Sequence, residues 1–145
     1  MMEWIVRKYQ TEDAQSIWEL NTKELGYVFS LEETEEKLAR LTNNPSHCLL
    51  VAEMQGKVVG YIHGNDYEVV YMPSFKNIMG LAVAKDYQHQ GIGKSLLMAL
   101  EQWAKETGAK GVRLVSGGER FAAHQFYENC GYQKKKMQAN FRKEF

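Results

Sequence analysis

A glycine-containing loop directly before an amphipathic helix is the feature that most constrains this chain. The loop, residues 88–95, reads Gln-His-Gln-Gly-Ile-Gly-Lys-Ser and follows an apolar run at residues 78–83. The run is typical of a buried strand, and apolar residues at helical spacing after the loop indicate a helix that buries one face. The glycines therefore fall at a helix N-terminus, where backbone N–H groups lack internal partners and the helix dipole favours an anion. Since glycine lets a bulky anion approach the backbone closely, this loop predicts a phosphate site.

Two common phosphate-binding motifs do not fit the loop. A Walker A motif would match at residues 93–95 but needs its first glycine where this chain has Gln88. A dinucleotide-binding fingerprint would match at Gly91 and Gly93 but fails at Leu96, and too little chain follows for the rest of that domain. On the loop alone, an ordinary strand–loop–helix connection with incidental glycines remains the alternative.

Length and charge narrow the class of protein. The 145 residues, 44% hydrophobic and 25% charged, predict a single globular domain over residues 1–145. Lys and Arg together number 18, as do Asp and Glu, which argues against nucleic acid as a partner. We expect no membrane association, because no apolar stretch is long enough to span a bilayer, and no signal peptide, because residues 1–4, Met-Met-Glu-Trp, do not begin one. Cys48 and Cys130 lack metal-ligand spacing and indicate reduced thiols in the cytoplasm.

The rest of the chain alternates between strand and helix signals. We predict a helix at residues 11–25 with Thr11 as its N-cap, and a second helix opened by a capping box from Ser30 to Glu33. Runs at residues 48–53 and 58–63, joined through a glycine, indicate an antiparallel hairpin. Strand, glycine loop, helix and a strand near residues 111–115 form a βαβ unit, which requires a parallel pair with a right-handed crossover. Two further β-prone segments lie at residues 132–137 and 139–145.

A second motif makes a family resemblance specific. Residues 88–93 match the pattern Q-x-x-G-x-G, and residues 123–132 match A-x-x-x-Y-x-x-x-G-[FY], one helix and one strand downstream. The chain thereby resembles the GCN5-related N-acetyltransferase (GNAT) family over essentially its whole length. The resemblance implies an α/β (mixed α+β) fold, with a mostly antiparallel central sheet that includes one splayed parallel strand pair and is flanked by about four helices.

The resemblance also implies a donor and the residues that bind it. The donor would be acetyl-CoA, used as a co-substrate. Backbone groups of three strand residues, Leu81, Ala82 and Val83, would bind the pantetheine arm, and one N–H there would face the thioester oxygen. The pyrophosphate would lie on the loop amides of Gln88, His89, Gln90, Gly91, Ile92, Gly93, Lys94 and Ser95. Tyr127 would be the general acid that protonates the departing thiolate, although its spacing also suits a packed core aromatic.

Two positions depart from the family pattern. Arg120 stands where many members have an asparagine that contacts the cofactor; it would instead reach a phosphate or pair with a neighbouring acid. The strand that often supplies a glutamate as general base has none here. Glu68, Asp66 and His63 are then the candidate bases, and each also suits an ordinary loop or strand-edge role. No histidine pair has metal-ligand spacing, so we expect no metal.

The predicted function is therefore acetyl transfer from acetyl-CoA to a primary amine, directly within a ternary complex. The acceptor would be a small molecule or an amine of a peptide or protein. The alternative from another class is a non-catalytic module that binds acyl-CoA with the same fold, and O-acetyl transfer is a third hypothesis. A homodimer is compatible with the size of the chain and rests on family analogy alone.

Overall fold

The computed structural model describes residues 3–145, in two compact units: one ending at Leu114 and one comprising Val115–Phe145. The first unit contains, in chain order, β1 (Ile5–Lys8), a 3₁₀ turn (Thr11–Asp13), α1 (Ala14–Lys23), α2 (Leu31–Thr42), β2 (His47–Met54), β3 (Lys57–Tyr67), β4 (Phe75–Val83), a second 3₁₀ turn (Lys85–Tyr87), α3 (Ile92–Glu106) and β5 (Val112–Leu114). The second unit contains α4 (Phe121–Asn129).

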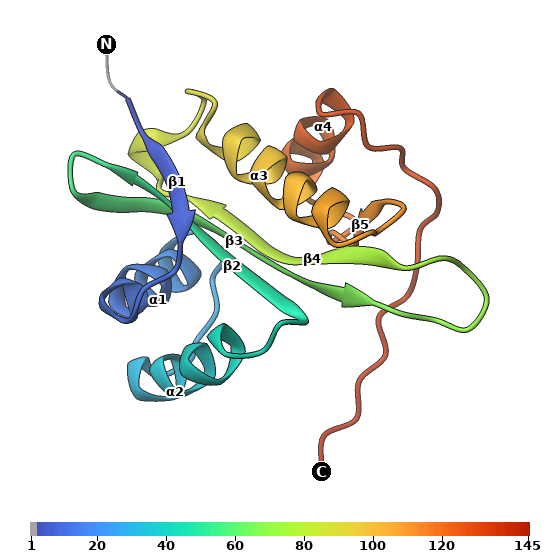
Figure 1. Cartoon of the computed structure of the whole chain (residues 1–145), viewed down its shortest axis with the longest axis horizontal. Coiled ribbons are helices and arrows are strands. Elements are labelled where there is room, and N and C mark those ends of the chain that lie inside the picture. The colour runs from blue at the N-terminus through green and yellow to red at the C-terminus, as the bar shows by residue number, and fades with distance from the viewer. Residues whose placement is uncertain (1–2) are drawn as a thin grey trace. The chain divides into compact units, whose positions relative to one another are not determined.

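The five strands form one sheet in the order β1-β2-β3-β4-β5 (Figure 1). Neighbouring strands are antiparallel except for β4 and β5, which are parallel and joined through α3. Figure 1 shows α1 and α2 on one face of this sheet and α3 on the other. The predicted fold class, a mostly antiparallel sheet with one parallel pair and about four helices, is confirmed.

The face toward α1 and α2 is packed by side chains that alternate along the strands. Leu49 and Val51 of β2 and Tyr61 of β3 form a buried cluster with Ile17 of α1 and Leu38 of α2. Successive residues of a strand point to opposite faces, so residues two apart, such as Leu49 and Val51, share this one.

The opposite face packs against α3. Leu96 and Leu100, one helical turn apart, are both fully buried. Gly60 and Gly64 of β3 lie beneath them, and a Cβ at Gly64 would come within 2.6 Å of Leu100. Glycine is therefore required at this position for α3 to approach the sheet as closely as it does.

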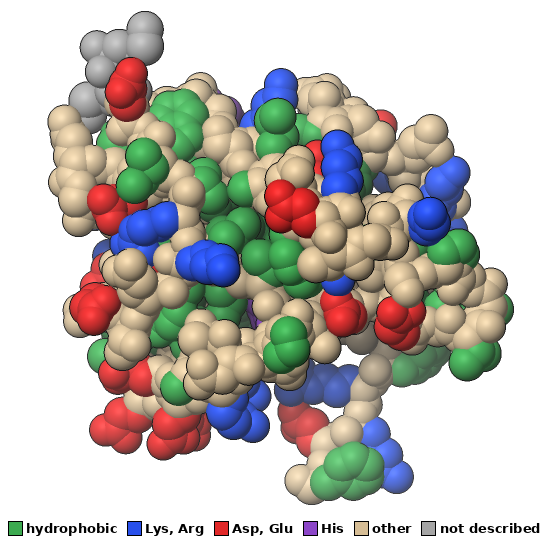
Figure 2. Space-filling view, in the orientation of Figure 1, with side chains coloured by type: hydrophobic (Ala, Val, Ile, Leu, Met, Phe, Trp, Pro, Cys, Tyr) green, Lys and Arg blue, Asp and Glu red, His purple; other side chains and the backbone are tan. Residues whose placement is uncertain are grey.

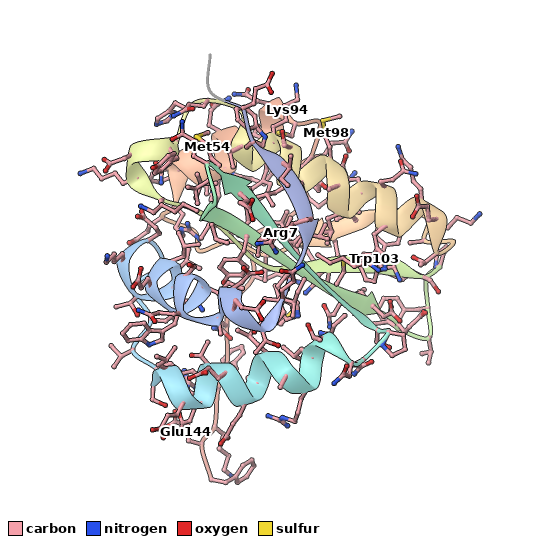
Figure 3. The ribbon with its side chains drawn as sticks, turned by 60° about the vertical axis from the view of Figure 1, so that its left-hand side comes forward. Arg7, Met54, Lys94, Met98, Trp103 and Glu144 are labelled. Atoms are coloured by element: carbon pink, nitrogen blue, oxygen red, sulfur yellow. The ribbon has the colours of Figure 1, made fainter. Side chains whose placement is uncertain are left out.

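Arg7 of β1, labelled in Figure 3, ties the N-terminal strand to its neighbours. Its guanidinium donates to both carboxylate oxygens of Asp13, at 2.8 and 3.0 Å, and to Glu53 of β2 at 2.9 Å. The Asp13 carboxylate also accepts from the Gln10 N–H. Since Asp13 is buried, these charge-assisted hydrogen bonds compensate for its removal from water.

Most of the predicted helix and turn signals have the expected structure, with two corrections. The Ser30 hydroxyl accepts from the Glu33 N–H at the start of α2, and the β2–β3 hairpin turns through Gln55 and Gly56, both with positive φ. The N-cap prediction at Thr11 is wrong, because this residue begins a 3₁₀ turn organised by the Asp13 carboxylate. The β-prone segments of residues 132–145 are also not strands: the structure describes them without helix or strand, and a strand needs a paired neighbour to satisfy its backbone.

Candidate active site

The parallel pairing of β4 with β5 ends where β4 acquires an extra residue. Strand β5 pairs with β4 only at residues 76–78, where Ile78 lies opposite Leu114. The next residue, Met79, has no counterpart in β3, because His63 lies opposite Gly80 while Gly64 lies opposite Ile78. Such a bulge bends a strand and increases its local twist. The bulge therefore coincides with the point at which the two parallel strands part.

Beyond the bulge, β4 continues along β3 without β5. Leu81, Ala82 and Val83 pair with β3 on one side only. Hydrogen-bonded and non-hydrogen-bonded positions alternate along an antiparallel pair, so at least one of these residues directs its N–H and C=O to the open edge. An extended amide-containing ligand can add to such an edge as a further strand would.

The glycine loop follows directly and ends at an uncapped helix. The Gln88 side chain donates to the Val83 carbonyl at 2.8 Å, which fixes the start of the loop. His89 and Gly91 have positive φ values of 65° and 103°, and Gly91 is the N-cap of α3. No side chain of the described residues caps α3, in contrast to Ser30 at α2. The first amides of α3 are thus left for another partner.

The surroundings of the loop keep it accessible. Gln88, His89, Gln90, Gly91 and Lys94 are all exposed, whereas Ile92 is buried. Figure 3 shows Lys94 near the start of α3 and Trp103 near its other end. The Trp4 indole N–H donates to the Ser95 hydroxyl at 3.1 Å, so the residue directly before β1 helps to hold the first turn of α3. The amides of residues 88–95 and the positive charge of Lys94 together suit a phosphate group.

In the second unit, Tyr127 lies on α4. Its ring contacts Phe126 and Tyr132 edge-on, with centroids 5.1 and 5.8 Å away. Burial raises the pKa of the Tyr127 hydroxyl, against the opposing charge of Arg120. A tyrosine with a raised pKa is fully protonated near neutral pH and can therefore donate a proton.

Two side-chain polar atoms of this unit are buried. The Ser116 hydroxyl and His124 Nδ1 are buried without a hydrogen-bond partner in the described residues, although His124 Nε2 lies 2.9 Å from the Gly117 carbonyl. Arg120, which is exposed, forms no ion pair with Glu119 among the contacts of the described residues. Its guanidinium is therefore available to an external anion.

The three candidate bases lie in different environments. The Glu68 carboxylate is exposed just beyond β3 and accepts from the Ser74 hydroxyl at 2.7 Å. Asp66 pairs with the buried Lys76 at 2.5 Å. His63 lies opposite Gly80, directly beside the bulge. Glu68 is five positions after His63 in the chain, a distance of about 17 Å if the chain is fully extended.

His63 has a second histidine as its partner. His47 Nδ1 lies 2.9 Å from His63 Nε2, and the two rings are stacked. Burial, with a smaller contribution from His47, lowers the pKa of His63 to about 4. His63 is consequently neutral at physiological pH, with a lone pair on one of its two ring nitrogens.

A row of polar side chains that includes His47 crosses the sheet, and sequence reasoning missed it. Strand register aligns His47, Asn65, Asn77 and Arg113, one from each of β2 to β5. His63, Asn65 and Tyr67, at every second position of β3, are a partial signal for such a row, but the partners on the other strands are distant in sequence. We call these four residues the polar row.

Charge is mixed over the surface. Figure 2 shows acidic and basic side chains interspersed on the face that it presents. Within residues 3–145, no group of three or more His, Cys, Asp and Glu side chains is arranged to hold a metal ion. None of the helices in that range has the length and apolar composition needed to cross a membrane.

Comparison with known sequences identifies the family. The acetyltransferase (GNAT) family model matches residues 14–132. An uncharacterised N-acetyltransferase of Methanocaldococcus jannaschii is 27% identical over 135 residues, which cover 92% of this chain and 80% of that protein. N-acetyltransferase family 8 member 2 of Rattus norvegicus is 33% identical over 87 residues, which cover 58% of this chain and 38% of the rat protein. A probable N-acetyltransferase of Arabidopsis thaliana is 26% identical over 119 residues, covering 67% of this chain and only 30% of the plant protein.

Solved structures share the fold. An aminoglycoside N-acetyltransferase in complex with CoA has a TM-score of 0.90 at 13% identity, covering 100% of this chain and 97% of that one. Glucosamine-6-phosphate N-acetyltransferase from Arabidopsis thaliana has a TM-score of 0.83 at 21% identity, covering 98% and 99%. At these identities the likeness concerns the fold alone.

The two comparisons agree with the geometry of the first unit, in which an open strand edge leads into a loop suited to phosphate. Acetyl-CoA is the co-substrate of the matched family. Because the family match extends over most of the chain, the chain belongs to the acetyltransferase (GNAT) family.

Proposed function

We propose that this chain transfers an acetyl group from acetyl-CoA to a primary amine, directly and within a ternary complex. The observation that supports this most is the continuity of the open β4 edge at residues 81–83 with the uncapped N-terminus of α3. Together they offer backbone partners for a pantetheine arm and amides for its pyrophosphate. The proposal treats both units as one acetyltransferase domain, because the family match crosses their boundary at Leu114.

In this proposal the cofactor-binding residues are those that the family motif predicts. Backbone groups of Leu81, Ala82 and Val83 bind the pantetheine arm. The amides of residues 88–95 bind the pyrophosphate, with additional positive charge from Lys94. Arg120 binds a phosphate group in place of the asparagine of other family members. When bound, acetyl-CoA supplies an acetyl thioester, and transfer of its acetyl group to an amine releases the coenzyme as a thiol.

The chain's own groups then handle charge and protons. An N–H at the open edge of β4 donates to the thioester oxygen as negative charge develops there. Tyr127, which is at the family's position for the general acid, gives its phenolic proton to the departing thiolate. The raised pKa of Tyr127, caused by burial, supports this role because the phenol is protonated before transfer. Cys48 is an unsuitable acyl carrier, because burial raises the pKa of its thiol to about 11.

The general base in this proposal is His63. A protonated amine must lose a proton before it can attack, and His63 lies directly beside the bulge of β4. Its position supports this role, whereas the pKa lowered by burial makes the imidazole a weak base. If His63 Nε2–H donates to His47 Nδ1, His63 Nδ1 is left with a lone pair to accept that proton. Glu68 remains the alternative predicted from the sequence. Its position beyond the end of β3, about 17 Å of extended chain from His63 and the bulge, weighs against it.

The test is release of free thiol from acetyl-CoA across a panel of amines, with matched alcohols included. Amine-dependent thiol release, with mass spectrometry of the acetylated product, is the expected result. Binding of acetyl-CoA without thiol release would favour the non-catalytic acyl-CoA-binding module. Release with alcohols instead of amines would favour O-acetyl transfer.

Location and assembly complete the proposal. A cytoplasmic location suits Cys48, a half-buried thiol that forms no disulfide. A homodimer is proposed by family analogy, and light scattering of the purified chain tests it: a monomer mass at all concentrations would exclude it.

A further inference from the structure

The polar row lies on the sheet face opposite α3. Lys76 and Gly64, the sequence neighbours of Asn77 and Asn65, contact Trp103 and Leu100 of α3. Since side chains alternate between faces, Asn77 and Asn65 point away from α3. Tyr61 and His63 share that face with Asn65, being two and four residues before it on β3. The row is therefore on the same face as the proposed base.

Arg113 is held in the row by two contacts. Its Nη1 donates to Asn77 Oδ1 at 2.5 Å, and its guanidinium lies 4.2 Å from the centroid of the Tyr67 ring. The Asn77 amide nitrogen is directed to Asn65 Oδ1 at 3.4 Å, at the long end of the hydrogen-bond range. The orientation of the guanidinium is thus set before any ligand arrives, which reduces the entropy lost on binding.

Within the described part of the chain, Arg113 has no anionic partner. No carboxylate of residues 3–145 lies within ion-pair distance of its guanidinium. The nearest acids along β3 are engaged elsewhere, Asp66 by Lys76 and Glu68 by Ser74. A partly buried guanidinium without a counter-ion is costly, and its planar donors match a carboxylate or a phosphate in a bidentate manner.

The distance from Arg113 to His63, the proposed base, sets the length that an acceptor must have. Arg113 lies opposite Asn77, and β4 runs from Asn77 through the bulge to Gly80, opposite His63. Those residues span about 10 Å of strand. An acceptor whose amine lies at His63 would therefore place a group several bonds away at Arg113.

We propose that the polar row is the acceptor site and that the acceptor carries a carboxylate or phosphate, several bonds from its reacting amine, which Arg113 binds. This inference rests on the proposed acetyltransferase function and specifies its substrate class. Polycationic amines are then poor acceptors, since the row offers a cation and amide groups but no carboxylate. The shared chemistry is an anionic oxyacid group, and the experiment separates its two forms.

The experiment measures kcat/KM by thiol release with two matched pairs of acceptors. The carboxylate pair is 6-aminohexanoate and hexylamine, and the phosphate pair is glucosamine 6-phosphate and glucosamine. In at least one pair, we expect the kcat/KM of the anionic acceptor to be 10-fold or more above that of its uncharged partner. The pair that shows this difference tells whether Arg113 binds a carboxylate or a phosphate. Spermidine is included as a polycation and is expected to be among the weakest acceptors. Equal or better turnover of the uncharged members or of spermidine would overturn the inference while leaving the acetyltransferase function intact.

Variants then assign the effect to Arg113. Arg113→Gln is expected to lower kcat/KM for the anionic acceptor at least 10-fold, mainly through KM, and to leave the uncharged acceptor within about twofold. Arg40→Gln, at an exposed arginine of α2, is the control and is expected to change neither. Should Arg113→Gln not fold, the comparison of acceptors with the unaltered protein still decides the question.

Calorimetry separates failure of this inference from failure of the proposed function. With CoA present, 6-aminohexanoate and glucosamine 6-phosphate are titrated into the unaltered protein and into Arg113→Gln. Binding that Arg113→Gln abolishes would support the site even if no amine were acetylated, in which case only the catalytic proposal would fail. Absence of binding of both anions to the unaltered protein would overturn the site.

Discussion

His47 and His63 share a hydrogen bond of 2.9 Å between ring nitrogens, although 16 residues separate them in the chain. Register brings them together on one sheet face, since Leu49 lies opposite His63 and His47 is two residues before Leu49. His63 adjoins the bulge of β4, and His47 belongs to the polar row. The proximity of His47 adds to the effect of burial, which is the larger cause of the lowered pKa of His63.

The lowered pKa of His63 predicts a pH dependence of stability. The pKa is about 4 in the folded protein, below its ordinary value of 6.5, so the unfolded chain binds more protons between these values. The free energy of unfolding is therefore expected to fall as the pH drops from 6.5 toward 4, by on the order of 2–3 kcal/mol from this group. Urea unfolding at several pH values measures it. His63→Gln should flatten that slope, whereas His89→Asn, at an exposed loop histidine, should retain it. An unchanged slope in His63→Gln would contradict the pKa assignment.

Replacing Tyr127 by phenylalanine removes the proposed proton donor and keeps the ring contacts with Phe126 and Tyr132. We expect kcat to fall about 100-fold, because general acid catalysis typically contributes that much or more. The affinity for acetyl-CoA, measured by calorimetry, should change little. Tyr71→Phe, at an exposed tyrosine in the β3–β4 loop, is the matched control. Turnover equal to that of the unaltered protein would remove Tyr127 from the mechanism.

Gly91→Ala tests the phosphate-binding loop. Gly91 has a φ of 103° at the N-cap of α3, where an alanine would be strained by about 1 kcal/mol and would move the first amides of the helix. We expect a loss of affinity for CoA of 10-fold or more. Gly108→Ala is the control, because it has a similar conformational cost just beyond the other end of α3. There φ is 83° and a Cβ meets nothing within 4 Å. Equal CoA affinities in the two variants would indicate that the loop does not bind the cofactor.

Arg7→Gln is expected to destabilise the N-terminal strand by about 3 kcal/mol, because it leaves the buried Asp13 carboxylate without its cation. Burial alone would raise the pKa of Asp13, but hydrogen bonds from Arg7 and the Gln10 N–H outweigh it and hold that pKa below its ordinary value. The pair therefore stabilises the fold above the unfolded pKa of Asp13, and this contribution is lost as the pH falls through the folded value.

Thermal unfolding at neutral and acidic pH checks the Arg7 prediction. The difference between Arg7→Gln and the unaltered protein should shrink as the pH is lowered toward 3. Lys8→Gln, at the exposed neighbouring residue, is the control. A difference independent of pH would mean that Arg7 acts through packing alone.

Local signals in the sequence predicted most of the fold correctly. The Ser30 cap and the Gln55–Gly56 hairpin are decided by neighbouring residues, so short-range patterns suffice to find them. The Thr11 prediction failed because Asp13 reaches back to Gln10 and across to Arg7, and the second of these contacts is tertiary. The strands predicted after residue 131 failed for a related reason, since β-propensity without a paired neighbour does not make a strand.

The sequence by itself determined the glycine loop, the βαβ order and the two motifs on which the family resemblance rests. Each of these is written in contiguous residues, so chemistry and spacing can be read along the chain. Only the tertiary structure decided where β4 bulges, that His47 meets His63, and that Arg113 completes a row with side chains from three other strands. Strand register sets these relationships, and a shift of one residue would turn each side chain to the opposite face. Register depends on packing across the whole sheet, and no local segment encodes it.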